Sequence, residues 1–208
     1  MNALLINGSP NAAGCTFTAL TEVAGELENA GIATEIFQIG HTAIRGCQAC
    51  YACRQPESTG YCIFKDDIVN GLIDKIRAAD AIVLGSPVYY AALSGQLKAL
   101  LDRAFFAGRF SHKLGAAVVS CRRGGASSAF DQLNHYFTIS NIHIVSSNYW
   151  NQVHGTTPDE VRQDLEGLQT MRALGKNMAW LLKCIDAGKN AGIELLVHED
   201  KIATNFIR

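Results

Sequence analysis

The chain has 208 residues, of which 48% are hydrophobic, and its 18 basic and 19 acidic residues give a formal net charge of −1. This length is enough for one domain with its own core, and the near-neutral charge excludes the basic surface of a nucleic-acid-binding or membrane-surface protein. No apolar run approaches the roughly 18 residues that span a bilayer, and the first residues form a strand pattern without a basic leader. We therefore expect a single cytoplasmic domain over residues 1–208.

Strand patterns alternate with helical patterns along the chain. The expected strands are Ala3–Ile6, Thr34–Gln38, Ala81–Gly85, Gly115–Ser120 and Ile142–Ser146. The expected helices cover residues 16–30, 67–78, 94–107, 126–138 and 159–187. Expected N-caps are Asp66 for the second helix and Thr157 or Asp159 for the last. The alternation predicts an α/β fold with right-handed crossovers and a parallel sheet. For this sheet we expect five strands in the order 2-1-3-4-5, which is a common order of doubly wound folds and does not follow from the alternation itself.

The loop after the first strand is the first candidate ligand site. Residues 7–16 read Asn-Gly-Ser-Pro-Asn-Ala-Ala-Gly-Cys-Thr, between a buried strand pattern and the start of a helix. Such a junction directs unpaired backbone N–H groups and the positive end of a helix dipole at one point, which suits a phosphate. A plain turn capped by Ser9 or Thr16 would have a similar sequence. Neither the dinucleotide fingerprint nor the P-loop motif is present, so a single phosphate monoester fits better than a triphosphate.

Two further loops follow the third and fourth expected strands. Residues 86–95 read Ser-Pro-Val-Tyr-Tyr-Ala-Ala-Leu-Ser-Gly, and residues 120–127 read Ser-Cys-Arg-Arg-Gly-Gly-Ala-Ser. In an open parallel sheet, ligands lie beyond the carboxyl ends of the strands at the topological switch point. Tyrosines, small residues and backbone amides beside a phosphate subsite suit a flat ring with a phosphorylated tail.

Four of the seven cysteines crowd into an irregular segment, residues 45–65. Their spacing is Cys47-x2-Cys50-x2-Cys53-x8-Cys62. In a chain of cytosolic type, such clustering favours reduced thiols, a metal or a redox role over a disulfide framework. A [4Fe–4S] cluster, a four-cysteine zinc site, and free thiols or labile disulfides all remain open. The separate Cys121 and Cys184 are expected to be small core residues.

Taken together, these residues resemble the flavodoxin-like NAD(P)H-dependent FMN reductases and, within them, the multimeric flavodoxins and iron–sulfur flavoproteins. The resemblance rests on Asn7-Gly8-Ser9-Pro10, the four-cysteine run, Ser86-Pro87-Val88-Tyr89, and Leu97-Lys98 with Asp102-Arg103. It covers the first half of the chain well, and residues 122–125 and 149–151 more loosely. It implies a flavodoxin-like three-layer sandwich with FMN as cofactor.

The resemblance also implies which residues contact FMN. The phosphate would be held by Ser9, Asn11, Cys15 and Thr16. The isoalloxazine ring and ribityl chain would lie along Pro87, Val88, Tyr89 and Tyr90. The pyrimidine edge of the ring would meet Ser120, Arg122, Gly124 and Gly125. Cys15 departs from the Ser or Asn-Thr that the family often has here, so backbone N–H groups and Thr16 would contribute more.

The implied function is an FMN-dependent oxidoreductase. It would take hydride from NAD(P)H and pass electrons to a small-molecule or redox-protein acceptor, with Cys47, Cys50, Cys53 and Cys62 as candidate ligands of a [4Fe–4S] cluster. The gap before Cys62 is longer than is usual in the iron–sulfur relatives, so the ligand set stays open. The flavin performs the redox step, and no side-chain acid or base is named as catalytic. Tyr89 and Arg122 are the best candidates for ring contact and charge stabilisation.

A flavodoxin-style electron carrier without NAD(P)H activity is the alternative function. The near-neutral charge and the extra cysteine loop favour the enzyme. A signalling domain on the same fold would need a phospho-acceptor Asp where Asn7 stands, so we set it aside.

Several of these residues also have plain structural interpretations. Tyr89 and Tyr90 would serve as aromatics that cap the core, and Arg122-Arg123 as a solvated pair. Lys98 and Asp102, at i and i+4, are expected to form an ion pair. The tail, residues 192–208, is expected at the subunit contacts of a homodimer or homotetramer.

Overall fold

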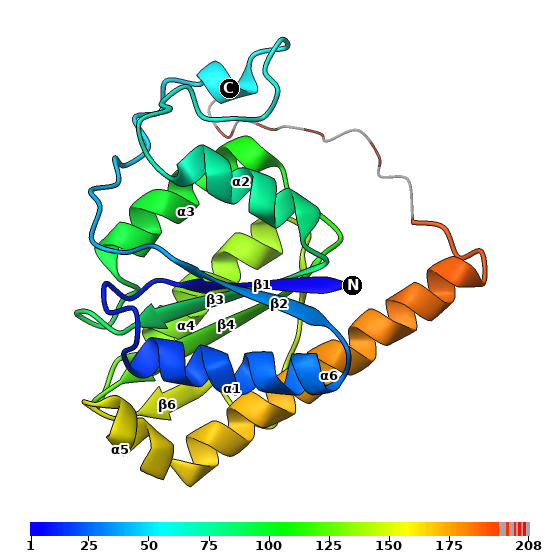
Figure 1. Cartoon of the computed structure of the whole chain (residues 1–208). Coiled ribbons are helices and arrows are strands. Elements are labelled where there is room, and N and C mark those ends of the chain that lie inside the picture. Colours follow the sequence, from blue (N-terminus) through cyan, green and yellow to red (C-terminus); the bar gives the residue numbers. More distant parts are fainter. Residues whose placement is uncertain (196–198, 200–201, 203, 205, 207–208) are drawn as a thin grey trace.

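The structure is a computed structural model that describes residues 1–195, 199, 202, 204 and 206 (Figure 1). Its strands are β1 (Asn2–Asn7), β2 (Ala33–Gln38), β3 (Ala81–Pro87), β4 (Leu114–Cys121), β5 (His143–Ile144) and β6 (Gln152–His154). Its helices are α1 (Cys15–Asn29), α2 (Val69–Ala78), α3 (Gly95–Gly108), α4 (Ala126–Ile139), α5 (Pro158–Gln163) and α6 (Leu165–Asn190), with a 3-10 turn, η1 (Ala52–Arg54). None of the helices in these described residues is long and apolar enough to cross a membrane.

The strands form a parallel sheet of order β2-β1-β3-β4-β5, which confirms the predicted order. The predicted fifth strand is wrong in length, because only His143–Ile144 pairs with the start of β4. A sixth strand, β6, pairs with the end of β4, so β5 and β6 share one edge of it. Between them the buried Asn151 side chain donates from Nδ2 to the Ala117 carbonyl at 2.9 Å and replaces strand pairing.

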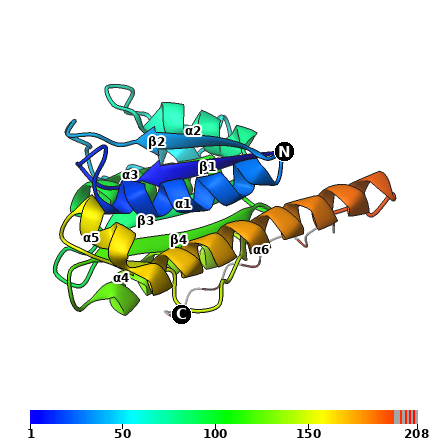
Figure 2. The same cartoon turned by 60° about the horizontal axis from the view of Figure 1, so that its bottom comes forward.

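Helices cover both faces of the sheet, and the core therefore lies in two layers. Alternate residues of β1 face opposite sides: Leu4 and Ile6 pack with α2, α3 and α4, and Ala3 and Leu5 pack with α1 and α6. Burial on both faces explains why β3 and β4 are apolar almost throughout. The three layers of the flavodoxin-like sandwich are visible in Figure 2.

The predicted helix at 159–187 is two helices that meet at Asp164. Its Oδ1 accepts from the Gly167 N–H at 2.9 Å and caps α6, and its Oδ2 accepts from the His154 N–H at 2.7 Å. Thr157 caps α5, as one of the two predicted alternatives. The prediction that Asp66 caps the second helix is wrong, because α2 begins only at Val69.

Three further predictions concern individual side chains. The Lys98–Asp102 ion pair is confirmed, with Nζ to Oδ1 at 2.9 Å. Cys121 is buried as expected, but the expectation that Cys184 lies in the core is wrong. Cys184 is exposed because the C-terminal half of α6 extends past the sheet (Figure 2).

Candidate functional site

Three loops meet beyond the carboxyl ends of β1, β3 and β4, at the edge opposite the N label in Figure 1. The Gly8 N–H donates to the Gly85 carbonyl at 2.8 Å, and the Val88 N–H donates to the Ser120 carbonyl at 2.9 Å. The Thr16 and Ser120 hydroxyls lie 2.8 Å apart, and both residues are buried. The structure therefore brings the three predicted loops together at the switch point of the sheet.

The N-terminus of α1 is left open toward ligand. Gly14 occupies the N-cap position, no side chain caps the helix, and its first turn contains no acidic residue. Neither Ser9 nor Thr16 acts as a cap, so the plain capped turn is not what the chain forms. A cavity of about 550 Å³ lies along residues 10–15, opposite residues 38, 40, 41 and 156–158. The first N–H groups of a 15-residue helix and its dipole thus face a space that admits an anion.

Hydrogen bonds fix the shape of this loop before any ligand binds. The buried Asn7 accepts from the Ser9 N–H at 3.2 Å and donates to the Gln38 side chain. Gln38 in turn donates from Nε2 to the Ser9 carbonyl at 2.7 Å, and the Ser9 hydroxyl accepts from the Asn11 N–H at 3.1 Å. The Ser9 hydroxyl proton remains to be donated to a ligand. Asn7 and Gln38 were not predicted as positioning residues, although each is a polar residue at the end of its strand.

The four predicted phosphate ligands lie in different environments. Ser9 and Thr16 are buried, and Asn11 is exposed. Cys15 directs its sulfur to the Gly155 carbonyl at 3.7 Å, and burial raises the pKa of its thiol. Cys15 therefore stays protonated at neutral pH and adds no negative charge beside a phosphate.

The second loop forms a tight exposed turn. Tyr89 and Ala92 exchange backbone hydrogen bonds at 2.9 and 3.0 Å. Tyr90 and Ala91, between them, both have positive φ, of 50° and 58°. Tyr89 is 47% exposed and Tyr90 is fully exposed, so neither caps the core. Held backbone strain of this kind is frequent in ligand-binding loops.

The third loop approaches the second closely through a glycine. Gly125 has a φ of 91°, and a Cβ there would lie 2.8 Å from the Ala91 Cα. Gly124 and Arg122 are exposed beside it, and Pro87 and Val88 are half-buried on the facing loop. Only glycine permits this spacing, which brings the backbone at Gly125 next to the tyrosine turn.

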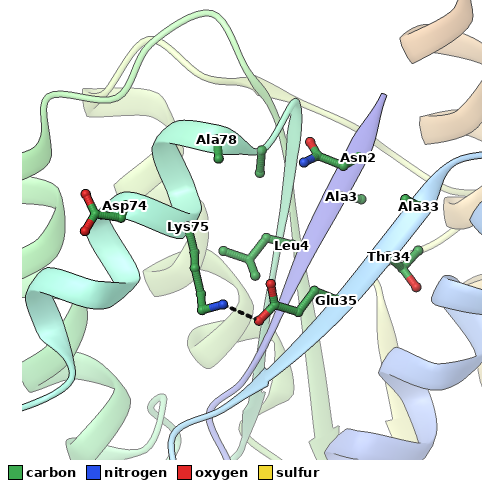
Figure 3. Close-up of a pocket in the computed structure, with 10 residues that line it drawn as sticks. Asn2, Ala3, Leu4, Ala33, Thr34, Glu35, Asp74, Lys75 and Ala78 are labelled. Carbon is green, nitrogen blue, oxygen red and sulfur yellow. Dashed lines mark hydrogen bonds and ion pairs between the residues drawn. The ribbon is translucent and has the colours of Figure 1, made fainter.

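A second hollow, of about 440 Å³, lies at the opposite edge of the sheet, between the starts of β1 and β2 and helix α2 (Figure 3). Lys75 points across it to Glu35, with Nζ to Oε1 at 2.7 Å. Both charges are partly exposed and neutralise each other. This hollow has none of the three loops, so we do not assign the ligand to it.

The four loop cysteines line one small, mainly apolar cavity beside Phe64, Phe106 and Arg103. Cys47 and Cys50 are exposed, Cys53 and Cys62 are half-buried, and all seven cysteines of the chain are free thiols. No group of three or more His, Cys, Asp or Glu side chains converges on one point within the described part of the chain. Four thiols around one apolar space fit the donor chemistry of an iron–sulfur cluster or zinc, although the sulfurs do not converge.

Comparison with known proteins connects this geometry with flavin proteins. Residues 1–157 match the family described as NADPH-dependent FMN reductase. An iron–sulfur flavoprotein of Methanocaldococcus jannaschii is 32% identical over 195 residues, covering 89% of this chain and 99% of that protein. An iron–sulfur flavoprotein of Methanosarcina thermophila is 30% identical, covering 83% and 88%. The solved structure of RosB with a bound intermediate superposes with a TM-score of 0.68 at 15% identity, covering 100% of this chain and 94% of RosB, which shows a shared fold.

Proposed function

Because the chain belongs to the NADPH-dependent FMN reductase family and is thus an FMN flavoprotein oxidoreductase, we propose that it takes hydride from NAD(P)H. The two electrons of the hydride then pass to a small-molecule or redox-protein acceptor. The single observation that carries the proposal is the open N-terminus of α1 beside a loop that is already held in shape.

The FMN phosphate binds at this N-terminus. Backbone N–H groups of α1 and the Ser9 hydroxyl donate to it, and Asn11 and Thr16 lie beside them. The Asn7–Gln38 pair holds the Ser9 backbone in place, so little loop entropy is lost on binding. The first turn of α1 contains no acidic residue, and the nearby Glu160 carboxylate, which helps to raise the pKa of the Cys15 thiol, is engaged by the Thr156 N–H.

The ring and ribityl chain lie between the second and third loops. Bound FMN supplies the chemistry, because it accepts a hydride as two electrons and releases them singly or together. Tyr89 is exposed at the turn and offers a ring face for contact. Arg122 and the amides at Gly124 and Gly125 donate toward the pyrimidine edge, where positive charge favours a reduced, anionic ring.

The cysteine loop is the proposed site of a [4Fe–4S] cluster, with Cys47, Cys50, Cys53 and Cys62 as ligands. The support is the shared cavity, the four-thiol donor set and the iron–sulfur relatives. A cluster at this position would give the protein a one-electron exit for electrons that arrive as hydride. Phe64 and Phe106 line the same cavity and give it part of its apolar wall, while Cys47 and Cys50 are exposed.

We also propose a homodimer or homotetramer. The C-terminal half of α6 exposes Trp180 (66%) and Ile185 (37%), and the tail exposes Ile193 and Leu195 before residues that lie outside the described part. Such apolar surface suits a second copy. Light scattering should give a dimer or tetramer mass, and a single monomer peak would contradict this.

Anaerobic mixing tests the enzyme against the electron carrier. FMN-loaded protein is mixed with NADH and, separately, with NADPH, and the flavin absorbance is followed. Bleaching within minutes with either nucleotide supports the oxidoreductase. A protein that binds FMN tightly but stays oxidised is a flavodoxin-style carrier instead.

A further inference from the structure

Arg103 of α3 is a charged side chain that the flavin site does not use. It is 2% exposed, and its guanidinium donates to four groups. NH1 reaches the Asp67 carboxylate and the Arg45 carbonyl (3.0 Å), NH2 the Phe64 carbonyl (3.3 Å), and Nε the Cys62 sulfur (3.3 Å). One buried cation therefore contacts both ends of the cysteine loop.

Stability alone does not explain the buried ion pair between Arg103 and Asp67. The Asp67 side chain is only 5% exposed, so both charges have lost their water. Desolvation of a buried ion pair costs about as much as the attraction returns, and apolar residues of similar size often stabilise more. The pair is better explained by what it does to the neighbouring sulfur.

Cys62 is the most restrained of the four loop cysteines. Asn70 of α2 accepts from its N–H and donates to its carbonyl, both at 2.9 Å, and Arg103 donates to its sulfur. Among the described residues, no hydrogen bond reaches the sulfur of Cys47, Cys50 or Cys53. One sulfur is thus fixed in direction by a side-chain hydrogen bond, and the other three sulfurs have no such bond among the described residues.

We propose that Arg103 is a positioning residue that presents the Cys62 sulfur to the iron–sulfur cluster and raises the reduction potential of that cluster. The inference rests on the proposed assignment of Cys62 as a ligand. An N–H donor and a positive charge beside a ligand sulfur stabilise the reduced cluster, which carries one more negative charge than the oxidised one. The Asp67 carboxylate opposes this effect by its charge and orients the guanidinium.

The test is an anaerobic one-electron titration of the reconstituted protein with dithionite, followed by the EPR signal of the reduced cluster. In that step the S–S bond of dithionite breaks to give SO2 radical anions, one of which transfers one electron to the cluster and ends as sulfite, while no bond of the cluster forms or breaks. Arg103→Gln should lower the equilibrium constant for reduction about tenfold, which is a fall of about 59 mV. Asp67→Asn should raise the potential, because it leaves the guanidinium charge unopposed. Opposite shifts from the two partners of one ion pair would not follow from general damage to the loop.

Arg45→Gln is the matched control. Arg45 also carries a guanidinium near this loop, 4.5 Å from the Phe64 ring centre and paired with Asp66, but its side chain is 44% exposed. Solvent screens the Arg45 charge, so its removal should change the equilibrium constant for cluster reduction less than about threefold. If Arg103→Gln does not fold by circular dichroism, Arg103→Lys replaces it. This variant keeps the charge but loses the Nε–H donor, so its potential should still be below that of the wild type.

The outcomes separate the two levels of the proposal. Unchanged potentials in the Arg103 variants, or shifts of the same sign in the Arg103 and Asp67 variants, overturn the role of Arg103 and leave the cluster in place. A wild-type protein that takes up no iron and sulfide on reconstitution overturns the cluster and, with it, the role of Arg103. The FMN site stands in either case, because it shares none of these residues.

Discussion

Replacing Ser9 by alanine should weaken FMN binding and leave riboflavin binding nearly unchanged. Ser9 is 5% exposed, and its hydroxyl accepts from the Asn11 N–H at 3.1 Å. The hydroxyl proton is therefore not used in this bond, and Ser9 Oγ lies 3.8 Å from where a Cβ would stand at Gly14, the N-cap of α1. FMN and riboflavin share the ring and ribityl chain and differ in the phosphate, so their comparison isolates this contact.

The expected loss follows from the type of hydrogen bond. A hydroxyl that donates to a charged phosphate oxygen contributes about 1.5–3 kcal/mol, which corresponds to a loss of FMN affinity of about 10-fold to 150-fold. The Asn11 N–H lies in an exposed loop and can bind water instead, so the folded state should lose only about 0.5–1.5 kcal/mol.

Quenching of flavin fluorescence measures both dissociation constants in one titration format. Thr21→Ala is the matched control, since Thr21 lies on α1, away from its N-terminus, and its hydroxyl donates to the Phe17 carbonyl at 2.9 Å. Equal losses of FMN and riboflavin affinity in Ser9→Ala, or the same loss of FMN affinity in Thr21→Ala, would refute a phosphate at the start of α1.

Four further predictions concern the stability of the fold, the close contact between the second and third loops, and the reactivity of the thiols. Gly8→Ala should destabilise the fold by about 1–3 kcal/mol in urea unfolding, because its Cβ would lie 2.6 Å from the Gly85 carbonyl; an unchanged midpoint would count against this contact. Gly125→Ala should weaken FMN and riboflavin binding together, since a side chain at φ 91° and 2.8 Å from Ala91 Cα forces the second and third loops apart; a selective loss of FMN would contradict it. Asp164→Ala should cost about 1 kcal/mol through the lost cap of α6, measured by thermal unfolding. In metal-free protein at pH 7, iodoacetamide should modify the exposed Cys184 early and the buried Cys121 last. Because burial raises the pKa of the Cys121 thiol from 9.0, its modification should accelerate only as the pH rises above that value. The folded state should lose stability over the same pH range, because the unfolded chain gives up this proton more readily.

The sequence was sufficient for the sheet because its elements are strongly periodic. Strands β3 and β4 are apolar almost throughout and lie between clear helical patterns, so the alternation predicted a parallel sheet, and the family resemblance agreed with its strand order. The fifth strand failed for a specific reason: the Asn151 side chain, not backbone pairing, occupies the middle of the β4 edge. No local pattern reports that a side chain 34 residues from its partner in β4 will replace a strand.

The candidate site was predicted in part for a similar reason. Loops at the ends of neighbouring parallel strands must meet, so Ser9, Tyr89 and Ser120 could be grouped from their positions alone. Long-range hydrogen bonds could not be read in this way. Gln38 reaches Ser9 across 29 positions, and Arg103 reaches Cys62 across 41. The split of the last helix, in contrast, was readable, since Asp164 three residues before Gly167 is an ordinary capping pattern.

Hydrogen–deuterium exchange with and without FMN tests the central claim most directly. The account predicts that FMN slows amide exchange in residues 8–16, 87–91 and 120–125 together, at the carboxyl edge of the sheet. Protection at the hollow around Lys75 and Glu35 in place of these loops, or no protection at saturating FMN, would contradict it.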